Sequence, residues 1–310
     1  MMGKTHYSLG ILYYLLFCMI QGFSLANFPN GKIMIIGMLG AALGAIFPDA
    51  DSDHSLINNR NPVFKVSNKI INYWRELLKK IFAFIFFAMP SILIIIYMYR
   101  ENYYSIGLII LSTILFILAF NGVKVGEKIY IPVLTYVLKS INSGAAKLRK
   151  LFMMIIYLSM ASASIYFSGG NVEGLIWGVI FIFIAIFPHR TFLHSPEGMI
   201  IVIIGVMYIE KRLQIPNIST AFSIGYFSHL YLADIFTNSG VPISTIPLIL
   251  RKLGIHSGLK KYKFYMVVYN ILNKKLSIPL IKTGSKLGSI VEGFYVFFLF
   301  ISLILVMTRG

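Results

Sequence analysis

Long apolar runs, separated by short polar or basic segments, dominate the chain. Eight of them approach the length of about 20 residues with which a helix crosses a bilayer core, and they lie near residues 7–26, 31–48, 81–99, 104–121, 151–168, 174–188, 217–236 and 290–308. A shorter run near 197–209 predicts a tilted, thin-spanning or re-entrant helix. The pattern therefore predicts an all-α fold, a polytopic integral membrane helical bundle with about eight or nine membrane helices.

Composition agrees with this interpretation. Of the 310 residues, 57% are hydrophobic and only 13% are charged, and the mean hydropathy of +0.79 is far above that of soluble domains. No internal repeat or glycine-rich phosphate loop interrupts the pattern, so we expect one membrane-embedded domain over residues 1–310. Residues 9–26 also resemble a signal peptide, because Lys4 precedes an apolar run, but we expect an uncleaved first helix.

The distribution of charge predicts how the helices are oriented. The net charge of +17 collects in basic segments near 51–80, 122–150 and 237–289, and the positive-inside rule places these segments in the cytoplasm. We therefore expect a multi-pass protein of the inner (cytoplasmic) membrane, whose lysines contact anionic lipid headgroups and not nucleic acid. Residues 129–143, broken by Pro132, are predicted to form a separate surface helix.

This threading brings most histidines and aspartates to one depth, at the cytoplasmic ends of the helices. The set consists of His6, Asp49, Asp51, His189, His194, His229 and Asp234, with Asp53 and His54 beside the first two aspartates. Ionisable groups at membrane depth are costly unless they are paired or bound, so the set indicates a site. Cys18 is the only cysteine, so His, Asp or Glu must hold any metal. We expect His6, Asp49, His194 and His229 to converge in one cluster, roughly 10 Å across.

Each polar motif also has a simpler interpretation. The stretch "PDADSDH" could be a solvated helix end, although negative charge at that end opposes the helix dipole. The stretch "HRTFLH" could be a basic turn meeting lipid headgroups, but the guanidinium of Arg190 between two imidazoles suits a phosphate held against a metal. Ser289 and Glu292 have the spacing of a capping box that could start the last helix, and a catalytic role for Glu292 stays open.

The spacing of His229 and Asp234 in "SHLYLAD" makes a geometric demand. At about 100° per residue, side chains five residues apart on a regular helix point about 140° apart and cannot easily serve one ion. If both residues act at the site, the helix must contain a π-bulge between Gly225 and Asp234 or must unwind before Asp234. The competing interpretation is a regular helix from which Asp234 points elsewhere.

Taken in order, "GKTH", "LGAIFPDAD", "HRTFLHS", "GYFSHLYLADIFTNSGVP" and "GSIVE" resemble the YdjM-type, LexA-regulated membrane-bound metal-dependent hydrolases. The resemblance extends almost end to end and implies a distant kinship with the all-helical zinc-dependent phospholipases C. It also implies site residues, which are His6, the pair Asp49 and Asp51, the turn residues His189, Arg190, His194 and Ser195, and His229 with Asp234. This chain departs from the family pattern at Leu193, where the family usually has Thr, and in the His229–Asp234 spacing, which is usually four.

From these residues and this resemblance we expect a hydrolase with a cytoplasm-facing divalent metal site that cleaves a phosphoester in a membrane lipid or lipid-linked substrate. Zn²⁺ is the expected metal, with Mn²⁺ or Mg²⁺ as alternatives because oxygen ligands are abundant. Asp51 is expected to accept the proton of bound water if it is not itself a ligand, Arg190 to stabilise the phosphoryl charge, and Ser195 to join the catalytic set. The alternatives are a non-catalytic metal-stabilised membrane protein or regulator, and a divalent-ion transporter, which would need a polar path across the bilayer.

Overall fold

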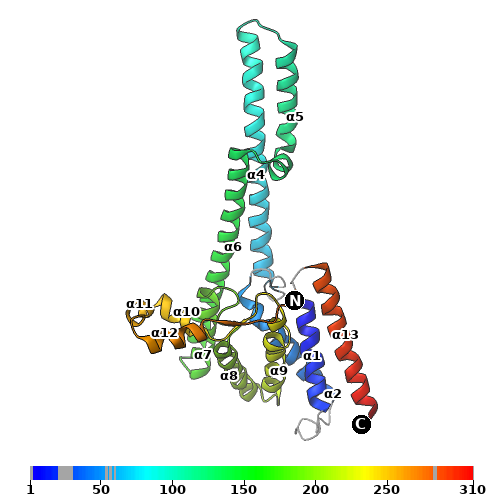
Figure 1. The fold of residues 1–310 in the computed structure, drawn as a ribbon, viewed down its shortest axis with the longest axis vertical. Coiled ribbons are helices and arrows are strands. Elements are labelled where there is room, and N and C mark those ends of the chain that lie inside the picture. The colour runs from blue at the N-terminus through cyan, green and yellow to red at the C-terminus, as the bar shows by residue number, and fades with distance from the viewer. Residues whose placement is uncertain are drawn as a thin grey trace. The chain divides into compact units, whose positions relative to one another are not determined.

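A computed structural model describes residues 3–19, 31–52, 55, 58, 61–281 and 285–309 (Figure 1). The α-helices in this part of the chain are α1 (Gly3–Met19), α2 (Gly31–Ile46), α4 (Pro62–Arg100), α5 (Ile106–Lys128), α6 (Pro132–Phe167), α7 (Val172–Ile186), α8 (Pro196–Leu213), α9 (Ile218–Tyr231), α10 (Ile246–Lys252), α11 (Ile255–Leu259), α12 (Lys263–Leu272) and α13 (Lys286–Arg309). Two short 3₁₀ helices, η2 (Phe47–Asp51) and η3 (Asp234–Phe236), follow α2 and α9. The all-α prediction is therefore confirmed.

The chain divides into two compact units, and each is described by itself. Unit 1 combines Met1–Asn61 with Met154–Gly310, and unit 2 is Pro62–Met153. The second boundary lies inside α6, so this helix belongs to both units. The expectation of a single membrane-embedded domain stays a prediction.

Unit 1 is built around α1, α2 and α9, which pack against one another, while α13 runs beside α1 (Figure 1). Tyr14, Ala41 and Ala221 form the buried core between α1, α2 and α9. The close approach of α2 and α9 requires glycine, because a Cβ added at Gly225 would come within 1.9 Å of the Ala41 carbonyl oxygen. A Cβ at Gly44 would come within 2.0 Å of the Phe222 carbonyl oxygen. Small residues at the contact let the two backbones approach, as is common between membrane helices.

Unit 2 contains the antiparallel pair α4 and α5, which lie side by side (Figure 1), and the first part of α6. Its core includes Ala83, Phe87 and Ala119 from the pair, and Leu134 and Leu138 from α6. Lys79 is buried and its Nζ lies 3.0 Å from an oxygen of Glu127. This pairing offsets part of the cost of removing an ammonium group from water.

Five helices of the described chain are long and apolar enough to cross a membrane. They are α4, α5, α6, the helical stretch Met34–Asp51 and the Leu287–Val306 portion of α13, and α7 is a shorter apolar helix. Between 17% and 44% of each apolar window is buried, so most of the apolar surface faces outward, as contact with lipid requires. All nine apolar runs expected from the sequence contain helix, but a total of eight or nine membrane helices stays a prediction.

The prediction of a separate, broken surface helix over 129–143 is wrong. Residues Pro132–Phe167 form one continuous helix that joins this region to the apolar run at 151–168. Pro132 occupies the first helical position, where no backbone N–H is needed and the ring favours the helical φ. The proline therefore starts α6 and does not break it.

The basic segment near 237–289 contains structure that the apolar pattern did not predict. Strand β1 (Val241–Pro242) pairs antiparallel with β2 (Lys275–Leu276), and the three short helices α10, α11 and α12 lie between the two strands. The last helix also begins differently from the expected capping box, since the Ser285 hydroxyl accepts from the backbone N–H of Gly288. Ser289 and Glu292 lie inside α13, so the expectation that they start this helix is wrong.

Candidate metal centre

Four segments of unit 1 bring their polar side chains together, and each does so at or near a helix end. They are the first turn of α1, the 3₁₀ helix η2 after α2, the loop at 187–195 between α7 and α8, and the end of α9 with η3. Their residues are separated by up to 228 positions, from His6 to Asp234, yet all belong to the same compact unit. The convergence expected from the sequence is observed.

Proline places the two aspartates of η2. Pro48 cannot donate a helical hydrogen bond, so α2 ends at Ile46 and the chain continues as a 3₁₀ turn through Asp51. Residues two apart in a 3₁₀ helix point in different directions. Asp49 consequently faces the other three segments, whereas Asp51 contacts His189 alone among the clustered histidines.

Two prolines also bracket the histidine-rich loop. Pro188 follows the last turn of α7, and Pro196 opens α8 directly after the N-cap residue Ser195. Between them Arg190 adopts a left-handed backbone conformation, with φ of 62°. This conformation is uncommon for a residue with a side chain and tends to occur at functional sites. The loop thereby directs His189, Arg190 and His194 toward the same cluster.

The end of α9 meets the geometric demand set by the His229–Asp234 spacing. The helix ends at Tyr231, Ala233 leaves the helical region with φ of −129° and ψ of −64°, and Asp234 begins η3. The predicted unwinding before Asp234 is confirmed, and the stretch contains no π-bulge. The Thr237 hydroxyl then donates to the Asp234 carbonyl at 2.7 Å and holds the new turn. His229 and Asp234 therefore face each other, with His229 Nε2 3.5 Å from Asp234 Oδ2.

The clustered nitrogen and oxygen atoms are separated by distances longer than good hydrogen bonds. Asp49 Oδ1 lies 3.6 Å from His194 Nε2 and 3.8 Å from His229 Nε2. Asp234 Oδ2 lies 3.4 Å from His194 Nε2, and Asp234 Oδ1 lies 3.9 Å from His6 Nε2. Three sets can each offer ligand atoms lying within 4.8 Å of one another, namely His6–Asp49–His229, Asp49–His189–His194 and His194–His229–Asp234.

Several of these atoms are buried without a hydrogen-bond partner in the described part of the chain. They are His6 Nδ1, both ring nitrogens of His194, His229 Nε2 and both carboxylate oxygens of Asp234. Buried polar atoms are nearly always satisfied, so His194 Nε2 and His229 Nε2, which both face Asp234 Oδ2, indicate a bound ion or ligand. Neutral imidazoles and carboxylates form the donor set that Zn²⁺ prefers when cysteine is absent. The residues present therefore fit a divalent metal.

The cluster has a buried floor and a partly exposed rim. The floor consists of His6, His194, His229 and Asp234, whose side chains are at most 2% exposed. The rim consists of Asp49, His189 and Arg190, whose side chains are 23%, 35% and 19% exposed. A molecule from outside would therefore reach the cluster across the rim.

Hydrogen bonds from behind fix the orientation of two histidines. His229 Nδ1 lies 2.6 Å from the carbonyl oxygen of Ala45, in the last turn of α2, where helical carbonyls lack partners. His189 Nδ1 lies 2.5 Å from Asp51 Oδ1. Each contact uses Nδ1–H as the donor and leaves Nε2, with its lone pair, facing the cluster. Asp51 lies outside the three potential ligand sets, and its contact with His189 is that of a positioning residue. Its expected roles as ligand and proton acceptor stay predictions.

Further positioning contacts involve residues that the sequence did not single out. The Asn58 amide donates to the carbonyl oxygens of Ala50 and Ser52, and the Tyr157 hydroxyl lies 2.8 Å from the Ala50 carbonyl oxygen. These bonds hold η2 and its aspartates. The buried Tyr226 hydroxyl donates to the carbonyl of Leu193 at 2.6 Å and holds the histidine loop. In the sequence, this role of Tyr226 could have been inferred only from its position three residues before His229, which places both side chains on one side of a helix.

Ser195 caps a helix. Its hydroxyl accepts from the Gly198 N–H at 3.2 Å and donates to the Phe192 carbonyl at 2.8 Å, and the side chain is fully buried. These bonds cap the N-terminus of α8, and the expected catalytic role of Ser195 stays a prediction. Glu292 is also buried. It accepts a hydrogen bond of 2.8 Å from the hydroxyl of Thr5, the residue that precedes His6 in the chain. Asp53 and His54 lie outside the described residues.

The charge state of His194 follows from its surroundings. Burial lowers its pKa, but the carboxylates of Asp234 and Asp49 outweigh this effect and raise the pKa to about 9. The two carboxylates therefore favour the protonated ring of His194. Only the neutral ring can bind a metal, so metal binding at His194 requires its deprotonated form.

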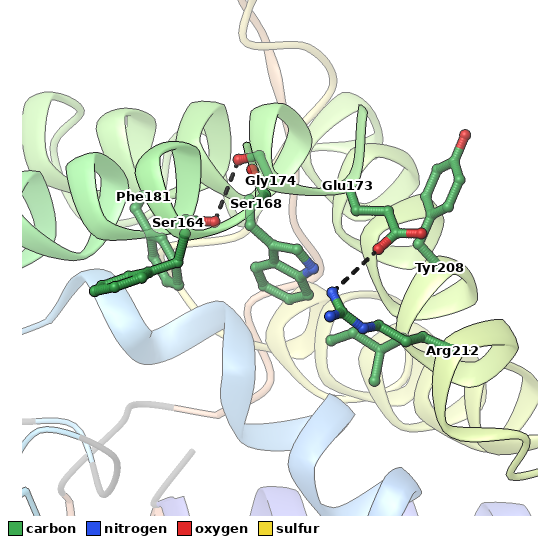
Figure 2. A pocket seen from close by; sticks show the side chains of 10 residues that line it. Ser164, Ser168, Glu173, Gly174, Phe181, Tyr208 and Arg212 are labelled. Carbon is green, nitrogen blue, oxygen red and sulfur yellow. Dashed lines mark hydrogen bonds and ion pairs between the residues drawn. The ribbon is translucent and has the colours of Figure 1, made fainter. Parts of the chain in front are cut away.

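A cavity of about 470 Å³ lies elsewhere in unit 1, between the start of α7 and the end of α8 (Figure 2). Glu173 is the only carboxylate in its lining and faces Arg212, with an N–O distance of 3.6 Å, while the lining contains no histidine. The Ser164 hydroxyl there donates to the Gly174 carbonyl. One paired carboxylate cannot hold a metal, so we assign the candidate chemistry to the cluster and not to this cavity.

The fold and the cluster together define a helical membrane protein with a candidate metal centre. The chain belongs to the YdjM inner membrane protein family, whose family model matches residues 1–310. No curated protein and no solved structure matches the chain. The match confirms the YdjM resemblance and the membrane assignment, while the expected hydrolase activity stays a prediction.

Replacing Asp51 with asparagine tests its assigned role. We expect metal affinity to fall by about 10–100-fold, as is typical when the partner behind a histidine ligand is lost, without emptying the centre. Competition with a chromogenic chelator measures this affinity. Unchanged affinity would mean that Asp51 does not support His189. Complete loss of metal would instead make Asp51 a ligand.

Proposed function

We propose that this protein is a membrane-bound metal-dependent hydrolase that cleaves a phosphoester in a lipid or lipid-linked substrate at the cytoplasmic face. The single observation that carries the proposal is the cluster of buried, mutually facing histidine and aspartate atoms with the guanidinium of Arg190 at its rim. When bound, a divalent ion at such a site supplies a Lewis acid and a hydroxide at neutral pH.

Asp49 would hold a metal together with either of two histidine pairs. One histidine nitrogen serves a single ion, whereas a carboxylate has two oxygens and could therefore serve both pairs. The sets that contain Asp49 divide the four histidines into two pairs, His6 with His229 and His189 with His194. The ring stacking of His6 on His229, with centroids 3.9 Å apart, agrees with this pairing. Asp234 lies near members of both pairs and can complete either site.

The spacing of the ligand atoms supports zinc. Atoms bound about 2.0–2.2 Å from one ion at the tetrahedral angle lie about 3.3–3.6 Å apart. Neighbouring ligands of an octahedral Mg²⁺ lie closer, about 2.9 Å apart. The separations of 3.4–3.9 Å among Asp49, Asp234 and the histidines are nearer to the tetrahedral value.

Arg190 is suited to bind the phosphoryl group. Its Nη2 lies 3.8 Å from Asp234 Oδ1, and its Nη1 is buried without a hydrogen-bond partner among the described residues. One side of the guanidinium thus contacts the cluster while the other can donate to a phosphoryl oxygen, which the planar fork of arginine recognises well. Because the rim is the exposed side of the cluster, we infer that the substrate's phosphoryl group enters there.

Hydrolysis is tested with the full chain in lipid nanodiscs, using a panel of phospholipids and lipid-linked phosphates. We expect release of phosphate or of a phosphorylated headgroup that stops with a chelator and returns with Zn²⁺. A water-soluble phosphoester with the same headgroup serves as the control for a lipid requirement. Metal-loaded protein that is inactive on every substrate would overturn the proposal and favour a metal-stabilised regulator. Zinc uptake into proteoliposomes would instead indicate a transporter.

A further inference from the structure

The helices α10, α11 and α12, between strands β1 and β2, carry a surface that the proposed hydrolysis does not use. One face of α12 packs inward: Tyr269 is buried, and its ring lies 4.2 Å from that of His256 in α11. The Tyr265 hydroxyl and His256 Nδ1 also form a hydrogen bond of 2.9 Å. These contacts fix which side of α12 faces α11.

The opposite face of α12 is an exposed apolar stripe. The stripe consists of Phe264, Val267, Val268 and Ile271, and Phe264 is 83% exposed. The spacings of three, four and seven residues place these side chains along one side of the helix. Leu253 and Tyr262 extend the exposed apolar surface beyond it. Such a surface marks a site of contact with a membrane or with another protein.

The length of α12 excludes a membrane span. Its ten residues measure about 15 Å along the axis, which is half of the roughly 30 Å hydrocarbon core. A short helix with an apolar side can instead lie in the plane of the membrane surface, with that side buried at the boundary between headgroups and acyl chains.

Charge identifies the partner. Residues 246–281 contain seven lysine or arginine residues and no aspartate or glutamate, and all seven are exposed. They are Arg251, Lys252, Lys260, Lys261, Lys263, Lys274 and Lys275. Lysines thus lie at both ends of the stripe, where they can reach phosphate groups while the stripe enters the apolar layer. A leaflet with anionic headgroups complements both features, whereas a nucleic acid would leave the stripe in water.

We propose that α12 is an in-plane membrane helix that inserts the stripe into a leaflet and binds anionic lipid headgroups through the flanking lysines. The segment is also tied to the candidate metal centre. Glu197, in the first turn of α8, accepts from the Ser244 hydroxyl and from the Thr245 N–H, and the Thr245 hydroxyl donates to the Thr191 carbonyl in the histidine loop. Insertion of α12 therefore fixes the distance between the lipid surface and the rim, whether or not the protein is a hydrolase.

Depth measurements by spin labelling test this proposal. Cys18 is the only cysteine, so Cys18→Ser gives a background in which Phe264→Cys carries a single nitroxide on the stripe. Asn270→Cys is the matched control, exposed on the same helix but outside the stripe. In nanodiscs with anionic lipid, we expect the Phe264→Cys label to collide severalfold more with oxygen than with a water-soluble nickel chelate. The Asn270→Cys label should show the reverse preference. Lys260→Gln, Lys261→Gln and Lys263→Gln together should make the Phe264→Cys label shallower.

Three outcomes would overturn the proposal. If both labels collide freely with the nickel chelate, the stripe lies in water. If the Phe264→Cys label is shielded from oxygen and chelate alike, protein covers the stripe, and spin–spin broadening would identify a second copy. If insertion is equally deep in neutral lipid and unaffected by the glutamine substitutions, the lysines do not bind headgroups. Monodisperse gel filtration of each variant confirms that the chain has folded.

Discussion

Replacing Asp49 with alanine is expected to empty the candidate metal centre. Its Oδ1 lies 3.6 Å from His194 Nε2, in one proposed ligand pair, and 3.8 Å from His229 Nε2, in the other. Removing the carboxylate would take a ligand and a negative charge from both pairs. Elemental analysis after gel filtration should therefore find about two ions per chain in the parent protein and almost none in the variant.

Two comparisons make the Asp49 result specific. Glu101→Ala removes an exposed carboxylate from unit 2 and should leave the metal content unchanged. His189→Ala should remove one ion of the two, because His189 belongs to only one of the three potential ligand sets. An Asp49→Ala protein that keeps its full metal content while remaining folded would contradict the shared-carboxylate arrangement.

Replacing Arg190 with alanine is expected to separate metal binding from turnover. The guanidinium cannot ligate a cation, so the metal content should stay at the parent level. Turnover of the phosphoester should fall by about 10²–10³-fold, the usual effect of removing one donor that stabilises transition-state charge. Alanine and arginine meet the same left-handed backbone strain at φ of 62°, so the substitution tests the side chain and not the turn. Phosphate release and elemental analysis on the same preparation measure both quantities.

Arg190→Lys provides the charge-matched comparison. Lysine keeps the positive charge but loses the planar fork, so turnover between that of the parent protein and that of the Arg190→Ala variant would indicate that charge and geometry both contribute. If Arg190→Ala emptied the centre as completely as Asp49→Ala, Arg190 would be part of the structure that holds the metal. The phosphate-binding role would then be wrong.

The sequence predicted the large features because they follow from strong, local physical demands. Apolar runs must form helices in lipid, and the lysine and arginine distribution alone brought His6, Asp49, His194 and His229 to one depth. The five-residue spacing from His229 to Asp234 predicted a π-bulge or unwinding before Asp234 if both residues act at the site, since a regular helix would have turned the carboxylate away. These predictions required no knowledge of which helices are neighbours.

Other features depend on the direction of individual side chains, which the sequence does not specify. Asp49 and Asp51 look equivalent in "PDAD", but the 3₁₀ turn points one into the cluster and the other behind His189. The Ser195 hydroxyl caps α8, a role that the sequence did not indicate. Pro132 was interpreted as a helix breaker because the start of a helix and its interior cannot be distinguished from one proline. In all three cases the local backbone conformation, which the apolar pattern does not specify, decides the outcome.

The division into two units has a consequence for how such proteins can diversify. Every residue assigned to the candidate metal centre lies in unit 1, on either side of Pro62–Met153 in the chain. Unit 2 is in this sense an insertion within a fold whose candidate metal centre is assembled without it. We therefore expect mutations, length changes or exchange of that insertion to leave the residues of the centre in place, so that this part of the chain can vary while the centre is kept.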